Sequence, residues 1–430
     1  MTEIIILFAS FFIMVFIRVP VAYALALASL LVIIYEGLNP VLFVQQMFHG
    51  LNSFPLLAVP FFLLAGQLLN SGQITERLLR LSQALVGHIR GGLAHINVVV
   101  SMLFAGMSGS STADTAGVGS VLIPAMIKRG YDRRFTIALT AASSTMGVII
   151  PPSILMVIYG AMGGVSIGGL FLAGAIPGAI VGLSQMVYSY YAAIRNNYPA
   201  ENRASLKELG SATKAGILPL MVPIIIVGGV LTGKFTATES GMIATVYVLF
   251  LIYGIYKTMS IRRLPNILME TAVIYSQPLL AVAAATIFGW LLAYFEAPEA
   301  IAGLAGDMIN SATLTVLFIA IVFVVVGTFM DAVPAIIIFL PIVDHMVQVS
   351  GANAIHTGLV VIMTLALGLI TPPYGLCLLL ACVLGKEPVT RVMGQMMVFY
   401  CLFAVVILII ILFPEISLWL PRLVMPKFVN

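Results

Sequence analysis

The apolar segments of this chain are interrupted in the same way once in each half of the sequence. An Asp precedes a Pro by ten residues at 114–124 and again at 331–341. A Gly precedes a Pro-Pro pair by four residues at 147–151 and again at 368–372. A backbone break at membrane depth survives only where protein buries it or where it lines a wet cavity. Paired breaks at corresponding places in two apolar halves are typical of the binding sites of secondary transporters.

The composition places the chain in a lipid bilayer. Of its 430 residues, 61% are hydrophobic and only 8% are charged, whereas a soluble domain is about 25% charged. Many long apolar runs indicate a protein that crosses the bilayer several times. The net charge of +4 is small and the basic residues lie in separate loop clusters, so we expect no nucleic-acid partner. The three cysteines fit neither a zinc site nor a disulfide framework.

Apolar runs of suitable length predict about ten spanning helices, because one crossing takes roughly 20 residues. Two further runs, residues 91–127 and 307–346, are too long for one crossing, and small or polar residues interrupt each of them. We therefore expect an all-α polytopic membrane protein with two re-entrant helical hairpins. Amphipathic surface helices are expected at 71–90 and 258–270. The expected spans are residues 3–17, 20–35, 54–70, a broken 135–162, 168–192, 214–232, 238–256, 271–294, a broken 355–384 and 392–413.

The distribution of charge predicts how the two halves are oriented, because Lys and Arg favour the cytoplasmic side. Both flanks of the first hairpin are basic, whereas the second hairpin lies in a stretch, 264–385, that contains no Lys or Arg. The first hairpin should therefore enter from the cytoplasm and the second from outside, with the N-terminus outside. We expect residues 1–194 and 214–430 to be inverted repeats joined by a polar cytoplasmic linker, 195–213. The basic flanks are Arg77, Arg80, Arg90, Lys128, Arg129, Arg133 and Arg134.

The first hairpin carries a dense run of hydroxyl side chains at its middle. Gly106 and Gly109 allow a turn there, and the half-helix that follows points its free N–H groups at that turn. In the broken segment 135–162, Pro151 and Pro152 lack N–H donors, so earlier carbonyls lose their helical partners and are free to bind an ion. The alternative interpretation is that small and polar residues merely let the helices pack closely. The hydroxyls are those of Ser108, Ser110, Ser111 and Thr112.

The second hairpin offers fewer hydroxyls, and its main polar residue is an acid. Asp331 lies deep in an apolar segment, where ionisable residues are functional by default. It is equally well placed to cap the half-helix that follows it. For Asp114, which lies within the hydroxyl run, capping is the favoured interpretation. The other candidates are the hydroxyls of Thr328 and Thr371 and carbonyl groups near Gly327, Met330 and Gly368.

Four segments resemble the large membrane subunit of tripartite ATP-independent periplasmic (TRAP) transporters. They are GMSGSSTADTAGVGSVLIPAMIKRGYD, GVIIPPSILMVIYG, FMDAVPAIIIFLPI and LGLITPPYGL, and the likeness covers nearly the whole chain. The resemblance implies an inverted-repeat, elevator-type transporter of the bacterial inner membrane that is coupled to two or more sodium ions and is not an enzyme. It also implies a small membrane subunit, a periplasmic substrate-binding protein and an organic-acid substrate. That substrate would be a C4-dicarboxylate, a keto acid or a sugar acid such as sialic acid, and the hydroxyl run at 143–145 favours the sugar acid.

Carried over by position, the resemblance places two sodium ions and the substrate at the hairpin tips and the helix breaks. The first sodium would contact Ser108, Ser110, Ser111, Gly147, Val148 and Pro151. The second would contact Gly327, Thr328, Met330, Gly368, Thr371 and Pro372. The substrate carboxylate would lie between the tips, at Ser110, Thr112, Ser144, Ser153 or Asp331.

Three other functions are alternatives to that of a TRAP transporter subunit. A stand-alone sodium symporter or antiporter of the same fold would work without a binding protein or a small subunit. A channel would pass its substrate without depending on the sodium gradient. A polytopic membrane enzyme would need a cluster of catalytic carboxylates, histidines or metal ligands, and the sequence offers no such cluster.

Overall fold

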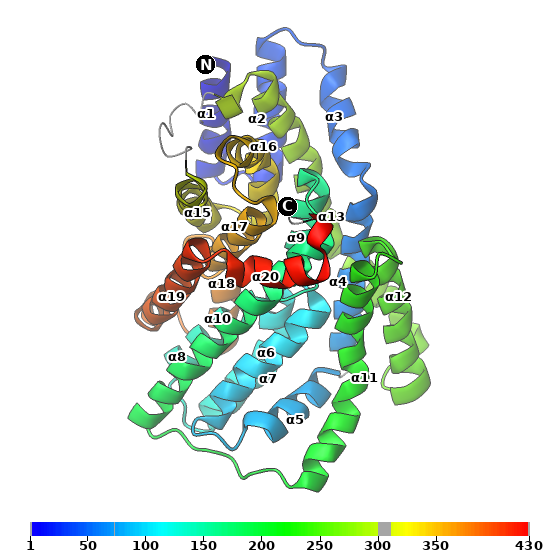
Figure 1. Ribbon diagram of the computed structural model, residues 1–430, viewed down its shortest axis with the longest axis vertical. Helices are drawn as coiled ribbons and strands as arrows, with labels where there is room; N and C mark the ends of the chain where they lie inside the picture. The colour runs from blue at the N-terminus through cyan, green and yellow to red at the C-terminus, as the bar shows by residue number, and fades with distance from the viewer. Residues whose placement is uncertain (1, 73, 300–310, 429–430) are drawn as a thin grey trace.

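The computed structural model describes residues 2–72, 74–299 and 311–428, and within these ranges every regular element is a helix (Figure 1). Eight of the described helices are long and apolar enough to cross a membrane, by length and composition. Six shorter apolar helices include four that begin or end at the predicted breaks. The chain is therefore an all-α polytopic membrane protein, as its sequence predicts. Residues 307–310 of the predicted second hairpin lie outside the described residues.

The first half of the chain contains the first hairpin and the first broken helix. Two of its helices begin at clear capping residues: Asp132 before α8 and Ser166 before α10 each accept an N–H three residues further on. The helices are α1 (Thr2–Phe16), α2 (Val21–Tyr35), α3 (Val41–Leu51), α4 (Ala58–Ser71), α5 (Ile74–Val86), α6 (Gly92–Ser108), α7 (Ser111–Lys128), α8 (Arg133–Ser144), α9 (Ile154–Gly163) and α10 (Ile167–Arg195).

The second half again contains a hairpin and a broken helix, and its first helix already starts at Leu206, inside the predicted linker 195–213. Capping boxes begin its first two helices, with Ser205 paired to Glu208 at α11 and Thr236 paired to Glu239 at α12. The helices are α11 (Leu206–Leu231), α12 (Ala237–Phe250), α13 (Leu264–Tyr294), α15 (Ala312–Phe329), α16 (Ala332–Ser350), α17 (Ala354–Gly368), α18 (Leu376–Gly385), α19 (Val389–Leu412) and α20 (Glu415–Val424).

In each hairpin the helix is interrupted where a residue that ends one helix is followed directly by a residue that caps the next. α6 ends at Gly109, which adopts a φ of 61° that other residues rarely tolerate. Ser110 then caps α7, its hydroxyl accepting the N–H of Ala113 at 3.4 Å. In the second hairpin, Met330 is extended and Asp331 caps α16. The two tips are therefore built from local capping chemistry.

Both ends of the first hairpin lie at the linker between α10 and α11. The N–H groups of Gly91 and Gly92, at the start of α6, donate to the carbonyl of Pro199 at 3.2 and 3.3 Å. The hydroxyl of Tyr131, which follows α7, donates to the same carbonyl at 3.4 Å. Burial raises the pKa of Tyr131 to about 12, so the phenol keeps the proton that it donates. α6 and α7 therefore enter the molecule from one end, where the linker runs along the bottom of Figure 1.

Removing the ring of Tyr198 should loosen this attachment. Its ring stacks on Tyr131 with centroids 4.3 Å apart, and its hydroxyl accepts the N–H of Asp132 at 3.1 Å. Because the side chain is buried, we expect Tyr198→Ala to cost about 3 kcal/mol and to lower the thermal unfolding midpoint of the purified protein in detergent. Tyr35→Ala is the control, because that tyrosine is 61% exposed. Equal midpoints for the two variants would contradict the role given to Tyr198.

The helices pack in two groups. The frame group consists of α1–α5 and α11–α13: α13 packs against α2, α3 and α4, and α12 packs against α4 and α11. The hairpin group consists of α6–α10 and α15–α20 and holds both hairpins and both broken helices. The groups meet mainly where α16 lies along α13 and where α6 lies along α5. In Figure 1 the second hairpin lies in the upper half of the molecule, opposite the end that holds the linker.

Several details differ from the sequence prediction. α3 and α20 were not expected, because both are short and carry polar side chains that suit a loop equally well. The amphipathic segment at 258–270 and the span at 271–294 were expected as separate helices. They form one helix, α13, which starts at Leu264 after a short 3₁₀ turn, because no Gly or Pro separates them and Pro265 stands at a first-turn position that a helix accepts.

Candidate functional site

The tip of the first hairpin is in direct contact with the break between α8 and α9. The N–H of Ile154, the first residue of α9, donates to the carbonyl of Gly109 in the tip at 3.2 Å. On the other side, a Cβ on Gly147 would lie 2.9 Å from the carbonyl oxygen of Ser110. Only glycine therefore fits at 147 while the two backbones remain this close.

Hydroxyl groups reinforce this contact. The hydroxyl of Ser111 donates to the carbonyl of Thr145 at 3.3 Å, across from the tip to the broken helix. Ser108 is buried, and its hydroxyl accepts the N–H of Ser110 at 3.4 Å within the tip. The first tip thus concentrates hydroxyl oxygens and carbonyl oxygens with no basic side chain among them.

Two carbonyls of the break complete the predicted first sodium site. Val148 offers a carbonyl that already accepts the hydroxyl of Ser153 at 2.7 Å. The carbonyl of Pro151 faces Gly106, where a Cβ would lie 3.6 Å from it. The structure therefore brings the six predicted residues together around one tip-to-break contact: Ser108, Ser110, Ser111, Gly147, Val148 and Pro151.

The second hairpin contacts the break between α17 and α18 in the same manner. The N–H of Tyr374 donates to the carbonyl of Thr328 in the tip at 2.9 Å. Its hydroxyl donates to a carboxylate oxygen of Asp331 at 3.0 Å. A Cβ on Gly368 would lie 2.5 Å from the carbonyl oxygen of Gly327. In each half of the chain, a glycine of the broken helix is thus in close contact with the backbone of the hairpin tip of the same half.

The hydroxyls of the second site are directed at their own helices. Thr328 donates to Val325 at 2.7 Å and Thr371 donates to Leu367 at 2.8 Å. Both hydroxyl protons are therefore used in hydrogen bonds within the helices. The two threonines can offer an ion only the lone pairs of their hydroxyl oxygens and their carbonyl oxygens. The structure gathers the predicted set around the second contact, with Met330 buried and extended between the half-helices. The set is Gly327, Thr328, Met330, Gly368, Thr371 and Pro372.

Helices from each broken segment pack against the hairpin of the other half. α18, which follows the second break, packs against α7 of the first hairpin, and α9, which follows the first break, packs against α16 of the second hairpin. Cys377, in the first turn of α18, lies beside the hydroxyl of Thr115 and within electrostatic reach of both Asp114 and Asp331. The tips of the two hairpins therefore approach each other inside the hairpin group.

The predicted substrate residues fall into an accessible set and a buried set. Ser110 and Thr112 are half-buried and exposed respectively, with their hydroxyl oxygens 3.1 Å apart. Ser144 and Ser153 are fully buried, and each donates its proton to a main-chain carbonyl of its own broken helix. Asp331 is half-buried and is held by its cap and by the tyrosine hydroxyl. The tip residues of the first hairpin therefore offer the open hydroxyls.

Asp114 does not cap α7, contrary to the sequence interpretation. Ser110 occupies the capping position, and Asp114 lies in the first turn of the helix with its side chain fully buried. Neither of its carboxyl oxygens has a hydrogen-bond partner. The residue in the first tip that corresponds to Asp331 is thus Ser110, because both are N-caps. The sequence carried this signal, since Ser is as good an N-cap as Asp and Ser110 follows the glycine that ends α6.

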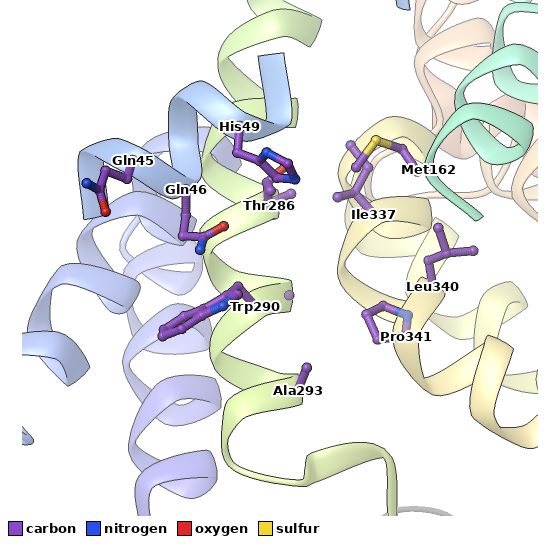
Figure 2. A pocket seen from close by; sticks show the side chains of 12 residues that line it. Gln45, Gln46, His49, Met162, Thr286, Trp290, Ala293, Ile337, Leu340 and Pro341 are labelled. Carbon is purple, nitrogen blue, oxygen red and sulfur yellow. The ribbon is translucent and has the colours of Figure 1, made fainter. Parts of the chain in front are cut away.

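A cavity of about 740 Å³ separates the frame group from the hairpin group. Figure 2 shows polar side chains of α3 and α13 on one wall and apolar side chains of α9 and α16 on the other. Sequence reasoning missed this cavity because it depends on α3, which was not expected. The polar wall carries Gln45, Gln46, His49, Thr286 and Trp290, and the apolar wall carries Met162, Ile337, Leu340 and Pro341.

Comparison with a solved structure identifies the fold. The YdaH transporter of Alcanivorax borkumensis matches with a TM-score of 0.59 at 15% sequence identity, over 88% of this chain and 87% of that one. At this level of identity the likeness establishes a shared fold alone.

Sequence comparisons identify the family. The large permease protein SiaM of the sialic acid TRAP transporter of Vibrio cholerae is 36% identical over 95% of this chain and 96% of its own length. The large permease protein DctM of the C4-dicarboxylate TRAP transporter of Pseudomonas aeruginosa is 35% identical over 88% of each chain. The family model described as "Tripartite ATP-independent periplasmic transporter, DctM component" matches residues 8–416. The chain therefore belongs to the DctM component family of tripartite ATP-independent periplasmic transporters, and is a multi-pass transporter permease rather than an enzyme.

Proposed function

We propose that this permease imports an organic acid that carries a carboxylate, driven by sodium and delivered by a periplasmic substrate-binding protein. The observation that supports the proposal best is the repeated contact between a hairpin tip and a broken helix. In each copy a glycine brings two irregular backbones together, at Gly147 and at Gly368. Irregular backbone of this kind, paired across two halves, is where transporters of known mechanism hold their ions and substrates.

The chemistry of the tips suits sodium and a carboxylate. Main-chain carbonyls and hydroxyl oxygens are ligands for hard cations, and both tips supply them. Two helices, α7 and α16, begin at the tips, and two more, α9 and α18, begin at the breaks. The N–H groups of a helix N-terminus favour an anion. A bound cation and a substrate carboxylate would neutralise each other, so that neither charge is moved through the membrane alone.

Two of the relatives suggest candidate classes of substrate. SiaM is named for sialic acid and DctM for C4-dicarboxylates, and both carry the carboxylate that the helix N-termini favour. The hydroxyl run at 143–145 gives less support to a sugar acid than its composition suggests. Ser143 donates to the side chain of Asn97, and Thr145 donates to the carbonyl of Ala142. Both classes therefore belong in the experiment below.

An elevator movement of the hairpin group against the frame group is the mechanism we propose. α13 presents small side chains to α16: a Cβ on Gly289 would lie 3.5 Å from the carbonyl of Ile337 and 3.8 Å from the ring of Pro341. The cavity of Figure 2 lies along the same boundary. An incompletely packed boundary lined by small side chains lets one group slide while the contacts that build the binding site stay within the other group.

We place the linker end of the molecule in the bacterial cytoplasm. Arg80, Arg129 and Arg203 line one cavity at that end, and basic residues favour the cytoplasmic side. The N-terminus lies at the opposite end in Figure 1 and is therefore assigned to the periplasm. In this orientation the second hairpin and the cavity of Figure 2 lie on the side where a periplasmic binding protein would dock, and the small membrane subunit would pack against the lipid-facing frame group.

The proposal is tested by reconstitution. Proteoliposomes that contain the permease with its small subunit would be supplied with the binding protein, an inward sodium gradient and labelled C4-dicarboxylates or sialic acid. We expect uptake of one class, and we expect a sodium ionophore to stop it. Uptake that needs neither the binding protein nor the small subunit would indicate a stand-alone transporter. Flux that survives collapse of the sodium gradient would indicate a channel.

Within this assay, Ser110→Ala should reduce sodium-driven uptake at least tenfold. The Ser110 hydroxyl caps α7 and faces the open side of the first tip, so its loss removes about 1–2 kcal/mol of capping as well as an oxygen ligand. Ser120→Ala is the matched control, because that hydroxyl bonds only to the carbonyl of Gly117 in the same helix, at 2.9 Å. Wild-type uptake by the Ser110 variant would remove this residue from the mechanism.

A further inference from the structure

Asp114 is the one fully buried carboxylic acid among the described residues, and its position demands a partner. Both of its carboxyl oxygens are shielded from solvent and neither accepts or donates a hydrogen bond within the protein. An ionised carboxylate in the low-dielectric interior of a membrane protein is strongly unfavourable unless it is paired. The N-terminal half-charge of α7 offsets only part of that cost.

The polar groups that face this carboxyl are two serine hydroxyls, those of Ser101 on α6 and Ser144 on α8. Both hydroxyls lie close enough to act on the charge of Asp114, but neither meets the distance and angle of a formed hydrogen bond. Ser144 donates its proton to the carbonyl of Thr140 at 2.8 Å. Ser101 donates its proton to the hydroxyl of Ser143 at 3.3 Å.

The direction of the second of these bonds is fixed by a buried network. Ser143 has two acceptors for its own proton, the side chain of Asn97 at 3.0 Å and the carbonyl of Thr140 at 3.1 Å, so Ser101 is the donor between the two serines. Asn97 in turn donates to Thr140 at 2.7 Å. Ser101 and Ser144 thus place two hydroxyl oxygens beside a carboxyl group whose own oxygens make no formed hydrogen bond, and such a group of oxygens attracts a cation.

We propose that Asp114, Ser101 and Ser144 form a binding site for a hard monovalent cation, sodium, in addition to the two sites at the hairpin tips. The inference rests on the proposed sodium-driven function and adds one coupling ion to it. The carboxylate would supply the charge and the two hydroxyls the neutral oxygens that hard cations prefer. All three side chains come from different helices, α7, α6 and α8, so a bound ion would tie the first hairpin to the first broken helix.

The site is also linked to the first tip through the backbone. The N–H of Asp114 donates to the carbonyl of Ser110 at 3.1 Å, and Ser110 is the cap of α7. An ion that fixes Asp114 therefore holds the first turn of α7 in the conformation that the tip requires. Binding at this site would precede or strengthen binding at the tip, which would make uptake depend on sodium more steeply than the two tip ions alone would.

The test is the number of sodium ions bound by the purified permease, measured by equilibrium binding of radioactive sodium. We expect Asp114→Asn to bind one sodium ion fewer than the wild type, and Ser144→Ala to bind the same number with about tenfold weaker affinity at one site. Asp344→Asn is the matched acid control: its carboxylate is exposed on α16 and accepts a bond from Gln348 at 2.8 Å, so its stoichiometry should equal that of the wild type.

Two results would overturn the site. One is an unchanged sodium stoichiometry in Asp114→Asn together with wild-type affinities in Ser144→Ala. The other is an unchanged sodium stoichiometry in Asp114→Asn together with wild-type uptake that a pH gradient drives and that this variant loses, which would make the bound cation a proton. If Asp114→Asn fails to fold, as judged by its thermal unfolding, the affinity of Ser144→Ala decides alone. A wild-type protein that binds no sodium would instead refute the proposed function itself, so the two failures are distinguishable.

Discussion

Gly368→Ala should abolish sodium-driven uptake while the protein still inserts into the membrane. A Cβ at this position would lie 2.5 Å from the carbonyl oxygen of Gly327 and 2.6 Å from its carbonyl carbon, where ordinary contacts begin near 3.4 Å. Both atoms are backbone, so the clash is relieved only by separating the second tip from its broken helix. Overpacking costs about 1–3 kcal/mol, and each 1.4 kcal/mol lost at an ion site lowers affinity about tenfold.

Gly147→Ala should have the same effect at the first tip, because its Cβ would lie 2.8 Å from the backbone of Ser110 and Ser111. The matched control is Gly394→Ala in α19, where a Cβ meets no atom within 4 Å and alanine favours the helix by about 1 kcal/mol. The measurement is uptake in proteoliposomes, normalised to the amount of inserted protein. Uptake by Gly368→Ala within twofold of the Gly394 control would show that the close approach is not needed for transport.

Asp331→Ala should reduce uptake at least tenfold, and the cause can be resolved by comparing substitutions. The side chain caps α16 through the N–H of Val333 at 3.4 Å and accepts the hydroxyl of Tyr374 at 3.0 Å. A lost cap costs about 1–2 kcal/mol, and a hydrogen bond to a charged group contributes about 1.5–3 kcal/mol. Because the carboxylate joins tip and break directly, its loss should disorder the second site.

The variant Asp331→Asn distinguishes the structural role of this side chain from the role of its negative charge. Asparagine caps helices as well as aspartate does and still accepts the tyrosine hydroxyl, so uptake close to wild type would assign Asp331 to the architecture of the tip. Uptake as low as that of Asp331→Ala would show that the negative charge itself acts on an ion or on the substrate. Tyr374→Phe completes a double-mutant cycle: additive losses in the Asp331→Ala, Tyr374→Phe pair would show that the two residues act independently.

The helix breaks were predictable from sequence because their causes are local. Gly109 ends α6 with a positive φ and Ser110 restarts the chain as a cap, and both residue types carry that meaning without tertiary context. The Pro-Pro pairs act through missing N–H donors in the same way. Most of the helices and both breaks could therefore be placed before any contact was known.

The parts that could not be predicted depend on contacts distant in sequence. Nothing in the sequence near Asp114 indicates that Ser101 donates to Ser143, because those two residues lie 42 positions apart, in α6 and α8. The helix α3 was also out of reach, since Gln45, Gln46 and His49 suit a loop equally well when the cavity that they line is unknown. Among the hydroxyls at 143–145, that of Ser143 also bonds to a distant residue, Asn97, and only packing reveals that bond.

The absence of Lys and Arg between residues 264 and 385 has a consequence for how the chain is made. During synthesis, basic residues near a membrane segment decide which way it is threaded. Most of the second half, including its hairpin and broken helix, contains no basic residue that could set its orientation. Its threading is therefore dictated from its two ends, by Arg262 and Arg263 on one side and Lys386 and Arg391 on the other. A long insert without basic residues can be threaded as a unit, so in the orientation proposed above its direction is set by four residues outside it.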